Sequence, residues 1–215
     1  MQRLFRSALT VAPPDYGTRL ANLKAQGAGQ PAALVAEFVE AGQLSLQGLA
    51  RDLDEIKLDQ AVTLLSQARI IHIAGFRRSF PVASYLAYVC DKLGLPAMLH
   101  DGVAGLAQRA ALQPGDALLA ITFAPYSDET LTLAAAARAL GVPVVLLTDP
   151  PATQLAGHAD AILTVTEVDF GAFRSLSATI TASAVSTTTR PLRPMQATRR
   201  PLDMARVSRV SCSMT

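Results

Sequence analysis

The sequence predicts an α/β fold: a doubly wound, mostly parallel five-stranded sheet with helices on both faces, preceded by N-terminal helices. From residue 69 onward, short β-branched apolar runs alternate with stretches of helical periodicity four or five times. Each apolar run is continuous rather than alternating with polar residues, which is typical of parallel strands buried on both faces. The chain has 215 residues, half of them hydrophobic, which is enough for one such domain with a buried core.

The segment before the sheet has helical periodicity. Residues 1–30 hold two short amphipathic stretches separated by prolines and glycines, and we interpret them as a helical remnant or linker. Pro31 suits a first helical position, and the apolar stripe after it predicts a helix that ends near Gly42. Further helices are expected from about Ser45, in LSLQGLARDL, and over 57–68, in KLDQAVTLLSQA.

The alternating region then divides into strands and helices. Strands are expected at 69–76, 96–102, 117–123, 142–149 and 161–167. Helices are expected at 79–95, 103–113, 128–140 and from about 171 to 184, with a short helix or loop at 154–160. Gly94 and Gly141 fit as the residues that end two of these helices.

Charge and cysteine content exclude several classes of protein. The formal net charge is +2, but residues 186–215 carry six arginines against Asp203, so the preceding residues are acidic overall and do not form a basic nucleic-acid binder. No apolar run approaches the roughly 18–20 residues of a membrane span. Cys90 and Cys212 lie far apart without a CxxC motif, which fits a reducing, cytoplasmic location. No spacing of His, Asp, Glu and Cys predicts a metal site, and we expect no cofactor.

The basic segment 186–215 differs abruptly from the rest of the chain. It has no apolar periodicity, three prolines and scattered arginines, and we expect a disordered tail. A change of reading frame near residue 185 would produce the same shift in composition. Non-specific contact of its arginines with a phosphate backbone is the functional alternative.

Two junctions between a strand and a helix carry side chains suited to binding an anion. They read GFRRSF (75–80) and FAPYSDET (123–130), and in a doubly wound sheet such junctions form the ligand site. Plain N-capping by the serines is the alternative, and the acids at 128 and 129 complement the helix dipole and would repel a phosphate. The ligand-binding residues predicted here are Gly75, Arg77, Arg78, Ser79, Thr122, Ser127 and Thr130.

These junctions carry a resemblance to a known family. The order helix, strand, GFRRS, helix, followed by GDALLAITFAPYSDETLTLAAAARALGVPVVLLTD, resembles the sugar isomerase (SIS) domain in its flavodoxin-like form, from roughly Pro31 to Ala182. It is most similar to the version carried by RpiR/MurR-type bacterial transcription regulators. In that family the first loop reads Gly-x-Gly-x-Ser and the second Ser-x-Ser-Gly-x-Thr, and their hydroxyls hold the phosphate of a phosphosugar.

The match to the two family loops is partial. Gly75 and Ser79 fit the first loop, and Arg77 stands where the second glycine belongs. In the second loop four positions are replaced in order: Thr122 for the first Ser, Ala124 for the second, Pro125 for the Gly and Ser127 for the Thr. Ala124 lacks a hydroxyl and Pro125 lacks a backbone N–H, so this phosphate site is weakened at its centre unless the arginines of the first loop compensate.

The resemblance implies a division of the chain and a function. Residues 31–185 would be the SIS-type phosphosugar-binding domain, acting without catalysis as the effector-binding and dimerising part of a regulator of carbohydrate metabolism. We expect a small anionic metabolite such as a sugar phosphate as partner, and a homodimer or homotetramer. No helix-turn-helix pattern precedes residue 31, so DNA would be bound only through such a domain outside this chain.

The alternatives are enzymes. A sugar-phosphate isomerase needs a base and a ring-opening acid, and Glu129, Glu167 and His100 are the candidates near the strand ends. A dehydrogenase is disfavoured because GFRRSF lacks the GxGxxG pattern. Secondary ligand candidates are His100, at the end of a strand, and Arg174 and Ser175, in a region that helps line the pocket in the family.

Overall fold

The structure is a computed structural model, and it describes residues 31–103, 109–150, 152–170 and 173–188. The predicted linker at 1–30 and most of the predicted tail, residues 189–215, lie outside the described residues.

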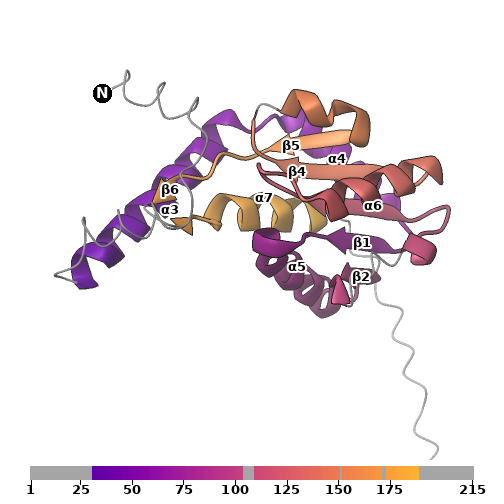
Figure 1. Ribbon diagram of the computed structural model, residues 1–215, viewed down its shortest axis with the longest axis horizontal. Coiled ribbons are helices and arrows are strands. Elements are labelled where there is room, and N and C mark those ends of the chain that lie inside the picture. The colour runs from indigo at the N-terminus through magenta and orange to yellow at the C-terminus, as the bar shows by residue number, and fades with distance from the viewer. Residues whose placement is uncertain (1–30, 104–108, 151, 171–172, 189–215) are drawn as a thin grey trace, which may run out of the picture.

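A five-stranded sheet forms the centre of the domain, and all its strands run parallel (Figure 1). Its strand order is β2-β1-β3-β4-β5. The strands are β1 (Ile71–Ala74), β2 (Ala97–His100), β3 (Ala117–Ile121), β4 (Val144–Thr148) and β5 (Ala161–Thr164). The predicted α/β class is confirmed, and each predicted strand is present in a shorter form. Strand order reverses between β1 and β3, which is the switch point where doubly wound sheets place their ligands.

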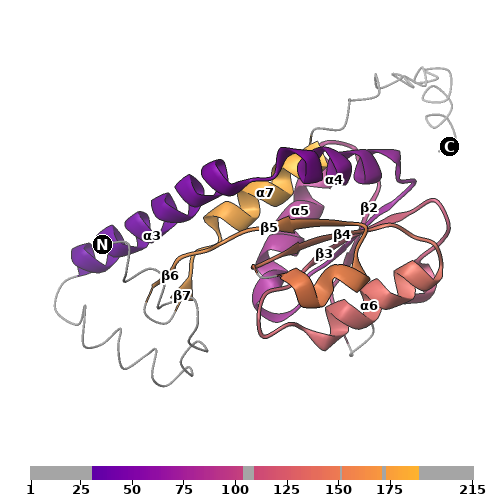
Figure 2. The same ribbon diagram turned by 90° about the horizontal axis from the view of Figure 1, so that it is seen from above.

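Helices cover both faces of the sheet unequally. Figure 2 shows α4 (Glu55–Gln67), α5 (Phe80–Lys92) and α7 (Ser177–Thr188) on one face and α6 (Asp128–Ala139) on the other. The first face buries branched strand residues such as Ile73 against side chains that include Leu86. The second face, which α6 covers, also packs against the 3-10 turns η3 (Arg109–Ala111) and η4 (Ala152–His158). The predicted helix at 103–113 is represented among the described residues by η3, a 3-10 turn.

The long helix α3 (Pro31–Asp52) corrects the prediction of two helices separated near Gly42. A Cβ atom on Gly42 would meet the Ser177 hydroxyl at 3.2 Å. The glycine therefore allows α7 to approach α3 closely and does not end the helix, and periodicity alone cannot separate these two uses of a glycine. The helix projects beyond the edge of the sheet (Figure 2).

The predicted final helix also begins later than expected. Residues 169–174 contribute β6 (Asp169–Phe170) and β7 (Phe173–Arg174), which pair antiparallel. The helix α7 starts only at Ser177, whose N–H donates to the Ser175 hydroxyl at 3.2 Å. This local bond satisfies the first amide of the helix and fixes where it begins. No helix among the described residues is long and apolar enough to cross a membrane.

Candidate functional site

The loops after β1 and β3 lie side by side at the switch point because these two strands pair directly, with Ala74 opposite Ala120. The first loop begins at Gly75, where a Cβ atom would meet the Ser79 carbonyl oxygen at 3.0 Å and the Ala83 Cβ at 3.1 Å. This glycine therefore lets the start of α5 pack against the end of the strand. Ser79 is 3% exposed, and its hydroxyl makes no capping bond to α5. Plain capping therefore does not account for Ser79.

Arg77 occupies the left-handed region of backbone conformation, with a φ of 54°. The loop thus keeps at this position a conformation that glycine adopts without strain, although the residue is arginine. The Arg77 side chain crosses to the second loop, where its Nη2 lies 3.2 Å from Glu129 Oε1. Its neighbour Arg78 makes a second crossing and donates a hydrogen bond to the carbonyl oxygen of Ala124. Two guanidinium groups therefore join the predicted loops.

The second loop is ordered by its own hydroxyls. The N–H of Ser127 donates to Thr122 Oγ1 at 3.0 Å. The Ser127 hydroxyl accepts from the Thr130 N–H at 3.3 Å, so Ser127 is the N-cap of α6, and it donates to Glu129 Oε2 at 2.7 Å. Thr130 is fully buried, and its hydroxyl has no hydrogen-bond partner among the described residues. The Ala124–Pro125 peptide bond is cis.

Glu129 is held in its ionised form. The Ser127 hydroxyl, a backbone N–H and the Arg77 guanidinium lower the pKa of this carboxyl from 4.5 to about 2. A fixed negative charge therefore stands between two groups predicted to bind an anion, Ser127 and Arg77. The sequence analysis expected an acid here to complement the helix dipole and repel a phosphate, and it did not predict the contact with Arg77.

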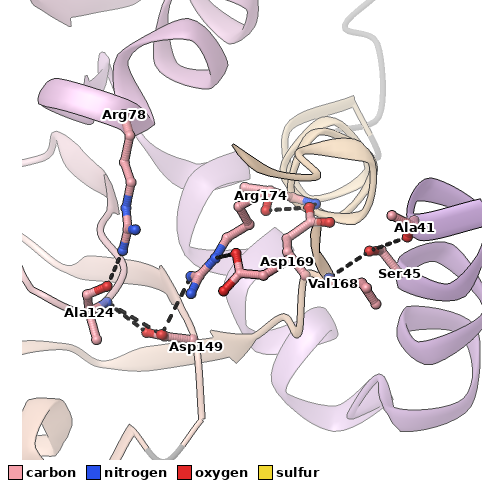
Figure 3. A network of polar contacts seen from close by, with 10 residues as sticks. Ala41, Ser45, Arg78, Ala124, Asp149, Val168, Asp169 and Arg174 are labelled. Atoms are coloured by element: carbon pink, nitrogen blue, oxygen red, sulfur yellow. Dashed lines mark hydrogen bonds and ion pairs between the residues drawn. The ribbon is translucent and has the colours of Figure 1, made fainter. Parts of the chain in front are cut away.

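A second carboxylate, which the sequence analysis missed, contacts the second loop from the end of the neighbouring strand β4. Asp149 follows β4 directly, and its two oxygens accept from the Ala124 N–H at 3.1 and 3.3 Å. Figure 3 shows Arg174 reaching the same carboxylate, with Nη1 3.6 Å from Asp149 Oδ2 and Nε 3.1 Å from Asp169 Oδ1. An acid at the carboxyl end of a buried strand was a usable signal, because such positions face the ligand site.

The secondary candidates separate in space. Arg174 joins the second loop through Asp149 and also stacks on Phe123, with its guanidinium carbon 5.9 Å from the ring centre. Ser175 bonds to Ser177 at 3.1 Å at the start of α7. His100 is wholly buried, and its Nε2 lies 3.0 Å from Nδ1 of His72. Its contact with Asp149 brings Arg174 to the second loop.

His72 links His100 to Asp116 in a buried polar chain. His72 Nε2 lies 3.1 Å from Asp116 Oδ2, and Asp116 also pairs with Arg69 at 2.9 Å. Since His72 and His100 are both fully buried and bonded to each other, this chain has the character of a structural network within the sheet. Within the described residues, no group of three or more His, Cys, Asp or Glu side chains could hold a metal ion.

Glu167 accepts hydrogen bonds from the first turn of α7. Its Oε1 accepts from the N–H and the hydroxyl of Thr179 at 2.6 and 2.7 Å. The residue is 8% exposed, and its Oε2 has no hydrogen-bond partner in the part of the chain that the structure describes. A carboxylate that accepts two donors at a helix N-terminus serves to fix that helix.

Comparison with known proteins agrees with this arrangement. The model of the SIS domain family matches residues 64–188, which include both loops, the switch point and α7. The chain belongs to the SIS domain family. The recognition made from the two loops is confirmed at the level of the family.

Solved structures of SIS domains share the fold of this chain. The sugar isomerase domain of the RpiR transcription factor from Sphaerobacter thermophilus is 22% identical, with a TM-score of 0.63, covering 73% of this chain and 87% of that one. The NanR protein of Vibrio vulnificus, complexed with ManNAc-6P, is 24% identical, with a TM-score of 0.64 and coverage of 86% and 70%. These SIS neighbours include a transcription factor and a protein with a bound sugar phosphate.

The SIS neighbours also include a protein for which an isomerase function has been inferred. A protein from Methanococcus jannaschii, whose structure infers the function of a 3-hexulose-6-phosphate isomerase, is 16% identical, with a TM-score of 0.54 and coverage of 72% and 85%. At these identities the likeness establishes the SIS fold, and function has to be argued from the site.

Proposed function

We propose that this SIS domain binds a phosphosugar or related anionic metabolite without catalysis, as the effector-binding and dimerising domain of a transcriptional regulator of carbohydrate metabolism. The observation that carries the proposal is the convergence of Arg77 and Arg78 from the first loop on the second loop, at the switch point of the sheet. Guanidinium groups, buried hydroxyls and a helix N-terminus together are the donors that bind a phosphate. The neighbouring NanR structure, which contains ManNAc-6P, supports the ligand class.

The contacts of the candidate catalytic groups favour binding over isomerisation. Glu129 is paired with Arg77 and Ser127, Glu167 fixes the start of α7, and His100 is buried against His72. An isomerase needs a base and an acid free to reach the sugar, and each of these groups is already engaged. An isomerase of the kind inferred for the neighbour from Methanococcus jannaschii is therefore the second candidate function.

The test is a thermal-shift titration with hexose and pentose phosphates, including ManNAc-6P, with unphosphorylated ManNAc as the matched control. A ligand at about 100 times its Kd adds about 2.7 kcal/mol to stability. For a domain of this size we therefore expect a rise in Tm of about 5 °C or more with the correct phosphate. The unphosphorylated sugar should give no shift.

Two variants place the ligand. Ser79→Ala and Arg78→Ala should reduce the shift, because they remove a buried hydroxyl and a cation from the first loop. Ser66→Ala is the control, since its hydroxyl bonds only along α4, to the Thr63 carbonyl. Shifts that are unchanged in both site variants would place the ligand elsewhere, and appearance of the isomeric sugar phosphate in an incubated sample would favour the enzyme.

Light scattering tests the proposed homodimer or homotetramer.

A further inference from the structure

The groups of the second loop that could bind an anion already hold carboxylates of the chain itself. The Ala124 N–H faces both oxygens of Asp149, at 3.1 and 3.3 Å. The same carboxylate lies 3.6 Å from the Arg174 guanidinium and 3.4 Å from the Thr148 hydroxyl. An amide, a guanidinium and a hydroxyl are the kinds of donor that a phosphate oxygen would use in this place.

Glu129 is a second carboxylate that occupies possible anion donors, here the Ser127 hydroxyl and the Arg77 guanidinium. Its carboxylate accepts from the Ser127 hydroxyl at 2.7 Å and pairs with Arg77 at 3.2 Å. Both donors belong to the residues that the proposed function assigns to the ligand. Asp149 and Glu129 thus occupy donors that an incoming anion needs.

The Asp149 contact also fixes the conformation of the loop. Ala124 is held on both sides of its backbone, since its N–H donates to Asp149 and its carbonyl accepts from Arg78 (Figure 3). An anion that takes the Ala124 N–H and Arg174 must first separate them from Asp149. Ligand binding at this loop is therefore an exchange of one anion for another.

We propose that Asp149 and Glu129 are internal competitors of the ligand and determine how strongly the site binds anions; this rests on the proposed function. A carboxylate carries one negative charge, whereas a phosphate ester carries about −1.5 to −2 at neutral pH and offers three oxygens. The exchange therefore favours a phosphate over a ligand with a single carboxylate. The apparent affinity is lowered by the fraction of molecules in which the internal carboxylate occupies the donors.

The experiment measures binding of ManNAc-6P and of inorganic phosphate to the full chain by calorimetry. If the donors are occupied about nine-tenths of the time, Asp149→Asn should bind about tenfold more tightly than the unchanged protein. Asp160→Asn is the matched control. Asp160 also accepts from a backbone N–H, that of Val144 at 2.8 Å, and pairs with Arg138 at 2.7 Å, but it precedes β5 and therefore lies at the amino ends of the strands, away from the loops. The Asp160→Asn variant removes the same charge as Asp149→Asn and should leave the affinity for both anions unchanged.

The outcomes separate this inference from the proposed function. Tighter binding by Asp149→Asn alone supports it. Equal or weaker binding by that variant, with clear binding by the unchanged protein, overturns the inference and leaves the proposed function in place. An absence of binding in every protein overturns both. If Asp149→Asn does not fold, Glu129→Gln provides the same comparison, with Glu40→Gln on the exposed side of α3 as its control.

Discussion

Arg77 reaches Glu129 across the two loops, with 3.2 Å between Nη2 and Oε1, from a backbone held at a φ of 54°. The pair combines a strained backbone with an exposed ion pair, whose contribution to stability is small. The loop geometry is thus retained at a position where glycine would be easier to accommodate. The retained side chain is a cation that lies between the two loops of the proposed site.

Replacing Arg77 with glycine should make the protein more stable while weakening anion binding. Relief of the left-handed conformation is worth about 1 kcal/mol, more than the loss of an exposed ion pair. Urea denaturation measures this gain, and Arg78→Gly is the matched control because Arg78 is not among the positive-φ residues. At position 78, glycine should lower the free energy of unfolding by about 0.5–1 kcal/mol. Destabilisation of similar size in both variants would show that position 77 carries no strain.

Thr122 and Ser127 should make separable contributions to the second loop. Thr122→Val removes the acceptor of the buried Ser127 N–H, which should cost about 1–3 kcal/mol. Ser127→Ala removes the N-cap of α6 and should cost about 1 kcal/mol. Thr122→Ser keeps the hydroxyl, and in urea denaturation it should remain close to the unchanged protein. A Thr122→Val protein as stable as the unchanged one would show that the hydroxyl does not order the loop.

Glu129 should contribute to the acid sensitivity of the protein. Its pKa is about 2 in the folded chain, against an ordinary value of 4.5. Its interactions therefore stabilise the fold fully above pH 4.5, and this stabilisation is lost as the pH falls from 4.5 toward 2. Glu129→Gln should show a smaller loss of stability over that interval, as followed by urea midpoints. Curves that run parallel for variant and unchanged protein would contradict the assignment.

Cys90 should resist thiol reagents in the folded protein. It is fully buried on α5, and burial raises the pKa of its thiol above 9.0. Labelling needs an exposed thiolate and hence local or global unfolding. In a Cys212→Ser background, which leaves one thiol, the reaction should be at least about a thousandfold slower in native buffer than in guanidinium chloride. Rapid native labelling would show that α5 opens readily.

Asp116 should be important for stability rather than for ligand binding. It is 1% exposed and holds both His72 and Arg69. Asp116→Ala should cost about 1–3 kcal/mol, because it leaves Nε2 of the buried His72 ring without its partner, whereas Asp116→Asn should cost less. Calorimetric unfolding measures both. A loss of phosphate affinity in a folded Asp116→Asn protein would instead connect the histidine chain to the site.

The sequence could predict the elements and the proximity of the two loops, because both follow from local patterns. The change from helical periodicity to continuous apolar runs located the strands, and parallel topology placed Ser79 and Ser127 at neighbouring strand ends. Contacts between distant segments could not be predicted in this way. Asp149 meets Ala124 across 25 positions, and Gly42 meets Ser177 across α3 and α7. Such pairs depend on packing, which periodicity does not encode.

The hydrogen bond from the Val168 N–H to Ser45, at 2.9 Å, gives the site a mechanical connection to α3. Ser175, the residue after Arg174, donates its N–H to the Val168 carbonyl at 3.2 Å, and the Ser45 hydroxyl donates to the Ala41 carbonyl at 2.8 Å. A displacement of Arg174 would therefore be transmitted to Ser45, which lies within the 22-residue helix α3 and not at its end. The far end of α3, away from the sheet, would then undergo the largest swing.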